Sequence, residues 1–593
     1  MSLRNGTHIR QAWQQGYWSA VRVSLRSDRW VKGDSEVALD SRVALRMGGA
    51  QIDSNGGRPI IGIANSASDL NPCNQPLDTY VSSLREGIDQ AGGIAVEFPV
   101  ISLGEDLMKP SSMLYRNFLA MEVEESVRSQ PIDAIVILAA CDKSIPGALM
   151  GAFSTALPTM LLVSGPRPVA TFEGRRIGTG TDLWRMWDRR RQGELTDEQW
   201  LDFEEALALG KGTCNTMGTA SSMGAISEAL GLAWPGSTSI PAGDSRHFEI
   251  ARQVGRRVVE LADAGIDITR QVSEEAIENA LTVLCALGGS TNAVIHLTAM
   301  ARRLGYELTL ETVDRIGRAT PVIVDIEPTG TALMEDLDAA GGVPSVMRAL
   351  KDRLHPAVVL GNGSETSKVA AKALSPNGVI RSLDAPVDAD GAFRVVKGNL
   401  APDGALIKRS AATASLLRHR GPAYVMHSSA EVIERTGEKS TATRDAVLVL
   451  SGAGPVGGPG MPEWGMIPVP TPLLREGVSD MVRVTDARMS GTSFGTVFLH
   501  AAPEAAVGGL IGLVRDGDMI SVDADGGSIE VEISDAELAE RLNEKTSTLA
   551  AARGYVALYQ RHVLQAPMGC DFDFLGIEVG ERPHLDEPVV GRS

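Results

Sequence analysis

Cysteine is scarce in this chain, and basic residues are fewer than acidic ones. Five cysteines among 593 residues are too few and too scattered for a disulfide framework, so a reducing compartment, the cytoplasm, is expected. The chain has 56 lysines and arginines against 74 aspartates and glutamates, which gives a net charge of −18. Binding to nucleic acid requires a basic surface, so we expect no nucleic acid as a partner.

Long hydrophobic runs are also missing. The apolar run at residues 134–140 is too short to cross a bilayer, so no membrane partner is expected. Residues 1–27 contain arginines but no acidic residue, a composition that organellar transit peptides share. Their Trp13, Tyr17 and Trp18 suit a packing arm equally well, and we expect residues 1–45 to form an N-terminal arm.

What the chain does contain, from residue 59 onward, is an alternation of strand-like apolar runs with helical stretches. This order predicts a doubly wound α/β domain with parallel strands over residues 46–385, and ligands of such sheets bind at the carboxyl ends of the strands. The predicted strands cover 59–64, 94–100, 134–140 and 158–163. The predicted helices cover 77–91, 111–128, 183–209, 216–232, 245–263, 274–286 and 292–304.

The C-terminal third has a different texture. A chain of this length exceeds a single hydrophobic core, and we place the domain change in residues 355–395, which read as short strands and turns. Residues 386–593 are predicted to form a β-rich domain. Its strand candidates are 394–397, 446–450, 519–522 and 529–533, with a hairpin turn signal at Asp525-Gly526-Gly527 between the last two.

Three of the five cysteines, Cys73, Cys141 and Cys214, lie in short polar loops. Thiolates bind iron–sulfur clusters and zinc, so these loops are candidates for soft-metal ligands. The alternative is that each is a small buried hydrophobe, as Cys285 in its apolar run is expected to be. Cys73 and Cys141 both follow a predicted strand, which favours a common site.

Charged residues near these loops suggest a second, hard metal. Asp142 and Lys143 directly follow Cys141, and Glu105 follows another strand end. A carboxylate suits a cation such as Mg²⁺, although a solvated charge pair and a surface acid are the plainer alternatives.

Three further loops contain candidate residues. The glycine-rich stretch 452–460 lacks the Lys-Ser/Thr of a phosphate loop; its glycines are expected to let the backbone approach a ligand while Glu463 points into a site. Ser490 has no neighbouring histidine, so a Ser-His-Asp triad is not supported. Ser290 or Asn292 is expected to cap a helix, and the same turn could bind an anion, whereas His296 is expected to pack inside that helix.

Six ordered motifs resemble the dihydroxy-acid and sugar-acid dehydratase family over roughly residues 58–580. They are Cys-Asp-Lys-x-x-Pro-Gly at 141–147, Thr-Cys-Asn-Thr-Met-Gly-Thr-Ala at 213–220, Gly-Gly-Ser-Thr-Asn-Ala at 288–293, Lys-Gly-Asn-Leu-Ala-Pro at 397–402, Pro-Gly-Met-Pro-Glu at 459–463 and Asp-Ala-Arg-Met-Ser-Gly-Thr at 486–492.

The resemblance implies a set of roles for these residues. Cys73, Cys141 and Cys214 would hold a [2Fe–2S] cluster. Mg²⁺ would lie near Glu105, Asp142 and Glu463, with Lys143 carbamylated as a further oxygen ligand. Ser490 would be the catalytic base, and Thr492 and Ser290 would contact the substrate. The resemblance also implies a β-barrel-like, swivel-type C-terminal domain and a homodimer or homotetramer.

Within that family, three features are more similar to the pentonate (arabinonate-type) dehydratases: Arg116-Asn117, the insertion around 174–210, and Ala487-Arg488-Met489. The expected activity is dehydration of a small-molecule acid, a sugar acid such as L-arabinonate, to a 2-keto-3-deoxy acid. Gln75-Pro76 departs from the Gly-His pair usual in close relatives, which leaves the substrate contacts open. The alternatives are a dihydroxy-acid dehydratase acting on 2,3-dihydroxyisovalerate or another small dihydroxy acid, a non-catalytic cluster-binding protein, and a zinc protein.

Overall fold

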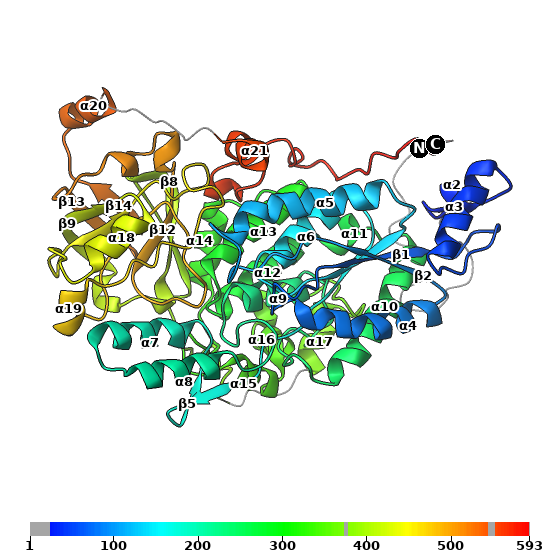
Figure 1. The fold of residues 1–593 in the computed structure, drawn as a ribbon, viewed down its shortest axis with the longest axis horizontal. Helices are drawn as coiled ribbons and strands as arrows, with labels where there is room; N and C mark the ends of the chain where they lie inside the picture. The colour runs from blue at the N-terminus through cyan, green and yellow to red at the C-terminus, as the bar shows by residue number, and fades with distance from the viewer. Residues whose placement is uncertain (1–23, 373–377, 544–551, 592–593) are drawn as a thin grey trace.

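The computed structural model of the protein describes residues 24–372, 378–543 and 552–591. In this part the chain forms a parallel β-sheet covered by helices and, further along, a closed β-barrel (Figure 1), which confirms the predicted fold class. Trp13, Tyr17 and Trp18 lie outside the described residues, and with them the choice between a targeting segment and a packing arm. No helix of the described residues is both long and apolar enough to span a membrane.

The N-terminal sheet has four strands, all parallel, in the order β2-β1-β3-β4. They are β1 (Ile60–Asn65), β2 (Ile94–Pro99), β3 (Ala134–Leu138) and β4 (Thr159–Leu162). Each lies where the sequence predicts a strand. The continuous apolar run of β3 is completely buried, as expected for a strand covered on both faces.

Different helices cover the two faces of this sheet, which makes it doubly wound. Helices α4 (Val81–Gln90) and α10 (Arg246–Ala264) pack on the face to which Ile61 and Ile63 of β1 point. Helices α5 (Arg116–Arg128) and α6 (Ser144–Ser154) lie in the core on the other face.

The chain leaves β1 toward one face of the sheet and leaves β3 toward the other, so the loops that follow these two neighbouring strands diverge. A crevice outside the carboxyl ends of the strands is expected at such a switch point. Cys73 lies in the loop after β1 and Cys141 in the loop after β3. The strand order therefore brings two of the three candidate ligands to one place.

The helical excursion predicted at 183–209 is a pair of helices, α7 (Thr181–Gln192) and α8 (Asp197–Leu207). A capping box separates them: the Thr196 side chain accepts a hydrogen bond from the Gln199 N–H, and the Gln199 side chain accepts one from the Thr196 N–H. In Figure 1 the pair lies beneath the barrel, and α7 packs on α19 (Thr471–Arg475). The α7–α8 pair therefore joins the two parts of the molecule.

The barrel closes in the order β10-β11-β12-β8-β7-β14-β13-β9. The predicted hairpin is correct, since β13 and β14 are antiparallel and their turn begins after the Asp523–Ser528 pair. Strands β8, β9, β11 and β12 were not predicted. The strands are β7 (Phe393–Gly398), β8 (Ala401–Lys408), β9 (Arg418–Met426), β10 (Val447–Leu450), β11 (Arg483–Thr485), β12 (Val497–Ala502), β13 (Met519–Asp523) and β14 (Ser528–Val531).

The remaining elements complete the helical layers. In residues 355–395, where short strands and turns were expected, the structure has isolated bridges and also a short helix, α17. The boundaries at residues 45 and 385 stay predictions. The elements not yet given are α2 (Asp28–Val31), α3 (Glu36–Met47), β5 (Ala170–Phe172), β6 (Arg175–Ile177), α9 (Thr219–Ala229), α11 (Ile268–Gln271), α12 (Glu274–Ala286), α13 (Thr291–Arg303), α14 (Leu310–Ala319), α15 (Met334–Ala339), α16 (Gly342–Ala349), α17 (Thr366–Lys372), α18 (Ser429–Thr436), α20 (Asp535–Asn543) and α21 (Gly554–His562).

Candidate active site

Hydrogen bonds tie the three cysteine loops together. Asn74 accepts hydrogen bonds on Oδ1 from the N–H groups of Ala140 and Cys141, each at 3.0 Å, and so fixes the first loop to the second. The third loop joins them because the Gly212 N–H donates to the Pro72 carbonyl at 3.0 Å. The first contact uses the Asn74 side chain and the second joins two backbone groups, and both lie within two residues of a cysteine, so together they fix the cysteine positions.

The side chains of Cys73 and Cys141 are buried, and that of Cys214 is partly exposed. A hydrogen bond with the Cys73 side chain, together with burial, raises the pKa of Cys141 well above its ordinary value. Burial raises the pKa of Cys214 to about 12. The raised pKa values disfavour the thiolate forms of Cys141 and Cys214, which a bound metal ion would stabilise. Cys285 behaves as expected of a small hydrophobe, since it is fully buried in α12.

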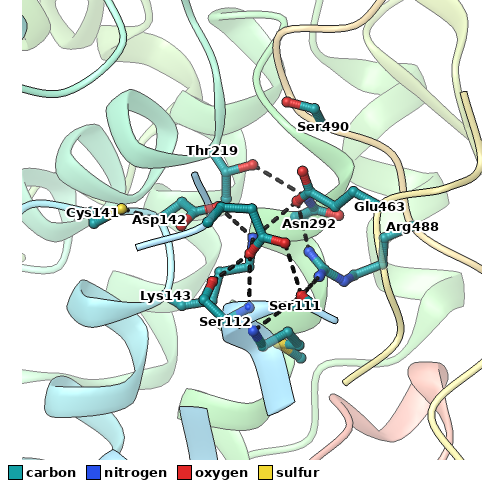
Figure 2. A network of polar contacts seen from close by, with 12 residues as sticks. Ser111, Ser112, Cys141, Asp142, Lys143, Thr219, Asn292, Glu463, Arg488 and Ser490 are labelled. Atoms are coloured by element: carbon teal, nitrogen blue, oxygen red, sulfur yellow. Dashed lines mark hydrogen bonds and ion pairs between the residues drawn. The ribbon is translucent and has the colours of Figure 1, made fainter. Parts of the chain in front are cut away.

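Lys143, fully buried, lies among three carboxylates (Figure 2). Its Nζ is 3.2 Å from Oε2 of Glu105 and 2.9 Å from Oε1 of Glu463, and it also donates to Asp142. Glu463 is 320 positions away in the sequence and belongs to the C-terminal part. The four residues predicted as a metal site therefore come together from both parts of the molecule.

Opposing charges set the proton affinities of this group. Burial and Arg488 would lower the pKa of Lys143, but the three carboxylates raise it above its ordinary value. Burial raises the pKa of Asp142 to about 6, while Lys143 opposes this shift. Burial would raise the pKa of Glu105, but the charges of Lys143 and Arg488 and two serine hydroxyls lower it to about 2.

No group of three or more His, Cys, Asp or Glu side chains in the described part of the chain is already arranged to hold a metal ion. The carboxylates instead surround the Lys143 ammonium. This charge pattern, with the acids outside and one cation between them, is the one that a divalent ion among acidic ligands would also produce.

Sequence reasoning missed three residues that hold the carboxylates. Ser111 donates to Oε1 of Glu105 at 2.9 Å, and Ser112 bonds its other oxygen. Asn292, which was expected only as a possible helix cap, donates from Nδ2 to Oε1 of Glu463 at 2.7 Å. Asn292 belongs to the Gly-Gly-Ser-Thr-Asn-Ala motif at 288–293, and this membership could have indicated a role in the site. The two serines belong to none of the six motifs.

Ser490 lies at the edge of this network (Figure 2). Its Oγ is 3.0 Å from Oγ1 of Thr492 and accepts a hydrogen bond from the Thr492 N–H at 3.4 Å. Ser290 is fully buried, caps α13 and lies 2.8 Å from Oγ1 of Thr219. Gly491 packs against both Ser290 and Thr219, because a Cβ at Gly491 would lie 2.7 Å from Oγ of Ser290 and from the Thr219 N–H nitrogen. The predicted base and the two predicted substrate contacts are therefore neighbours.

Two carboxylates hold part of the backbone of the glycine-rich loop 452–460. Asp486 accepts from the N–H groups of Gly452 and Ala453, and Glu504 accepts from those of Val456 and Gly457. Gly460 also allows close packing, since a Cβ there would lie 2.7 Å from the Leu114 N–H nitrogen, and the approach of this backbone to a ligand stays a prediction. His296, in contrast, is the packed helix residue that was expected, fully buried with Nδ1 3.0 Å from Arg116.

The doubly wound α/β part and the barrel-containing part meet at one set of thiols, carboxylates and a lysine. This arrangement is typical of an enzyme whose active site lies between two domains. Comparison with known proteins identifies the family. The family model described as dihydroxy-acid/6-phosphogluconate dehydratase matches with its N-terminal part at residues 58–368 and with its C-terminal part at residues 378–570. The chain belongs to this family.

Several relatives align over nearly their whole length. The chain is 44% identical to an L-arabonate dehydratase of Azospirillum brasilense, covering 95% of this chain and 100% of that protein. It is 43% identical to a 6-deoxy-6-sulfo-D-gluconate dehydratase of Pseudomonas putida, covering 95% and 98%. A dihydroxy-acid dehydratase of Natronomonas pharaonis is 37% identical, covering 84% and 87%.

Proposed function

We propose that this protein is a hydro-lyase that dehydrates a sugar acid, a pentonate such as L-arabinonate, to a 2-keto-3-deoxy acid. The relatives support this choice, since two that act on sugar acids share 43–44% of their residues with the chain and a dihydroxy-acid dehydratase shares 37%. The observation that carries the proposal is the meeting of Glu105, Asp142 and Glu463 around Lys143, next to Cys141.

The thiol set fits an iron–sulfur cluster. Cys73, Cys141 and Cys214 come from three loops held together by hydrogen bonds of the Asn74 side chain and of the backbone, and the first two side chains are buried. Three cysteines leave one cluster position without a protein ligand. We assign the [2Fe–2S] cluster to these residues.

The carboxylate set fits Mg²⁺, with one condition. Oxygen ligands from Glu105, Asp142 and Glu463 suit a hard cation, but the Lys143 ammonium lies between them. Carbamylation of Lys143 would replace this positive charge by an anionic oxygen donor. The site would then carry four anionic groups, and a divalent cation together with the Arg488 guanidinium would offset most of their charge.

When bound, the two metal groups would act as Lewis acids toward the oxygen atoms of the substrate. The residues of the chain then have separate tasks. Ser490 would take the C2 proton of the substrate on Oγ, and Thr492, 3.0 Å away, would orient that hydroxyl. Hydroxide leaves from C3, and the resulting enol becomes the 2-keto acid. A serine can act as a base only where nearby positive charge lowers its pKa strongly, so Ser490 depends on the metal site.

The proposal is tested by an anaerobic dehydration assay on a panel of aldonic and dihydroxy acids, with the visible spectrum recorded on the same sample. We expect a brown protein that forms a 2-keto-3-deoxy acid from a pentonate. Preference for 2,3-dihydroxyisovalerate would select the dihydroxy-acid alternative. A brown protein inactive on every acid would select the non-catalytic alternative, and zinc without iron in a metal analysis would exclude the cluster.

Replacement of the proposed base gives a sharper test. Ser490→Ala is expected to keep the visible spectrum and lose turnover by at least about 100-fold, the lower range for loss of a proton-transfer group. Ser493→Ala is the matched control, because Ser493 lies in the same loop and its buried Oγ has no hydrogen-bond partner among the described residues. Normal turnover by Ser490→Ala would show that another group is the base. The cytoplasmic location and the homo-oligomer stay predictions.

A further inference from the structure

Arg488 connects the carboxylates of the two parts of the molecule. Its guanidinium is fully buried and uses all three of its nitrogen atoms. Nε donates to the Met461 carbonyl at 2.7 Å, and Nη1 donates to Oε1 of Glu463 at 2.8 Å. Nη2 donates to Oγ of Ser111 at 2.9 Å.

The contact with Ser111 continues to Glu105. The Ser111 hydroxyl has one proton, and it donates that proton to Oε1 of Glu105 at 2.9 Å while it accepts from Arg488. The direction of this short chain is therefore fixed by the arginine, which can only donate. One planar guanidinium thus orients Glu463 of the C-terminal part directly and Glu105 of the N-terminal part through one hydroxyl.

The same residue anchors the loop that carries Ser490. Arg488 lies two positions before the proposed base, and the carbonyl of the intervening Met489 accepts a hydrogen bond from Asn292 at 3.0 Å. Asn292 in turn bonds Glu463 at 2.7 Å. The positions of the metal-site carboxylates and of the Ser490 loop are therefore fixed by one shared set of contacts.

We propose that Arg488 is a positioning residue that sets the geometry of the divalent-metal site across the domain boundary and couples it to the placement of Ser490. This inference rests on the proposed function. The planar shape of the guanidinium is needed here in addition to its charge, because a lysine at this position would keep the charge but lose the planar fork. Arg488 acts on the Mg²⁺ site and not on the cluster, since none of the Arg488 contacts reaches a cysteine ligand.

The test is Mg²⁺ binding to the cluster-containing protein, measured by anaerobic calorimetric titration in bicarbonate buffer. Arg488→Lys is expected to weaken Mg²⁺ binding about 10- to 100-fold, the usual effect of losing a group that orients a metal ligand, and to leave the visible spectrum unchanged. Ser111→Ala removes the connection to Glu105, together with the acceptors of Arg488 Nη2 and of the Met113 N–H, but keeps the direct bond from Arg488 to Glu463. A smaller loss, of about 2- to 10-fold, is therefore expected. The Mg²⁺ concentration that gives half-maximal turnover should be lowest in wild type, higher in Ser111→Ala and highest in Arg488→Lys.

Arg483→Lys is the matched control. Arg483 is equally buried in the same domain, but its guanidinium bonds Asp480 and the carbonyls of Ile467 and Met481, away from the metal site. Mg²⁺ affinity should stay at the wild-type value in this variant. A loss equal to that of Arg488→Lys would mean that any buried arginine has this effect, and it would overturn the inference.

The outcomes distinguish this inference from the proposed function. Equal Mg²⁺ affinity of wild type and Arg488→Lys, with turnover and spectrum retained in the wild type, overturns the role of Arg488 and leaves the function in place. If Arg488→Lys does not fold, unchanged affinity in Ser111→Ala overturns it. A wild-type protein that turns over substrate without binding Mg²⁺ removes the metal from the proposed function, and this inference with it.

Discussion

At the residue scale, Lys408 is a buried amine outside the candidate active site. It ends β8, is 1% exposed, and its Nζ has no hydrogen-bond partner in the part of the chain that the structure describes. Burial lowers its pKa to about 7. In the unfolded chain the pKa is about 10.4, so between pH 7 and 10 the unfolded state holds a proton that the folded state has lost. Stability therefore rises with pH in this window, by up to about 1.4 kcal/mol per pH unit.

Lys408→Met should remove this dependence. At pH 8 the variant is expected to be more stable than wild type by roughly 1–3 kcal/mol, because no buried amine has to lose its proton on folding. The midpoint of urea unfolding, measured at several values between pH 7 and 9.5, should rise with pH in wild type and stay flat in the variant. Lys397→Met is the control, since Lys397 is half-exposed and paired with Glu311. An identical pH slope in Lys408→Met and wild type would contradict the prediction.

Sequence analysis could predict the position of residues that belong to a motif. Cys141, Asp142 and Lys143 follow a recognisable strand, as expected, and their roles stay predictions. Ser111 and Ser112 were missed because a serine before a helix usually caps it, and Ser111 does so here by accepting from the Met113 N–H. Their contact with Glu105 depends on how the loop folds back, which no local pattern specifies.

At the element scale, the start of α7 presses against the Ser490 loop. Gly180 precedes α7 with φ +88°, and the Thr181 hydroxyl donates to the Thr492 carbonyl at 2.8 Å. A Cβ at Gly180 would lie 2.4 Å from Oγ1 of Thr492. That oxygen is the partner of Ser490, so the helix start limits where the proposed base can lie.

Gly180→Ala is therefore expected to displace Thr492 and to lower turnover at least about 10-fold, in line with the large effect of small shifts in reacting groups. The measurement is the turnover number on the best pentonate, with the melting temperature recorded alongside. Gly193→Ala is the control at the other end of α7: φ is +79° and nothing lies within 4 Å of an added Cβ, so it brings the backbone strain without the contact. Equal losses in both variants would show that strain alone is responsible.

The elements that were missed share a physical reason. Strands β8 and β9 contain Pro402 and Gly404, and Gly421 and Pro422, which interrupt the alternation on which strand prediction relies. Closure of the barrel pairs both strands nevertheless, with a register shift opposite β8 at residues 499–502. In contrast β3, β10 and the β13–β14 hairpin have unbroken apolar runs or a strong turn signal, and these were predicted from local pattern alone.

At the scale of the whole molecule, the C-terminal segment returns to the α/β part. In Figure 1 the segment after α21 runs above α5, and its residues 566–568 pack on α13. Arg303 of α13 holds it through Asp571, with Nε to Oδ2 at 2.7 Å and Nη2 to Oδ1 at 3.1 Å, and both side chains are fully buried. The adjacent Cys570 lies 3.8 Å from the Met461 sulfur, one step from Arg488. The segment therefore packs against Met461, whose carbonyl accepts a hydrogen bond from Arg488.

Breaking this ion pair on one side should be costly. Arg303→Met leaves the Asp571 carboxylate buried without its partner, and we expect a loss of about 3–5 kcal/mol in stability, seen as a lower melting temperature. Arg303→Met combined with Asp571→Leu should recover part of that loss, because two apolar groups replace this pair, while Glu124, 3.4 Å from Nη1 of Arg303, still loses its partner. Arg302→Met is the control one residue away: its guanidinium bonds only the Met568 sulfur at 3.9 Å among the described residues, so a change below about 1 kcal/mol is expected. If the single and double variants had the same melting temperature, the unpaired carboxylate would not be the cause of the lost stability. The segment would then be held by its apolar contacts around Phe572 and Tyr559 instead.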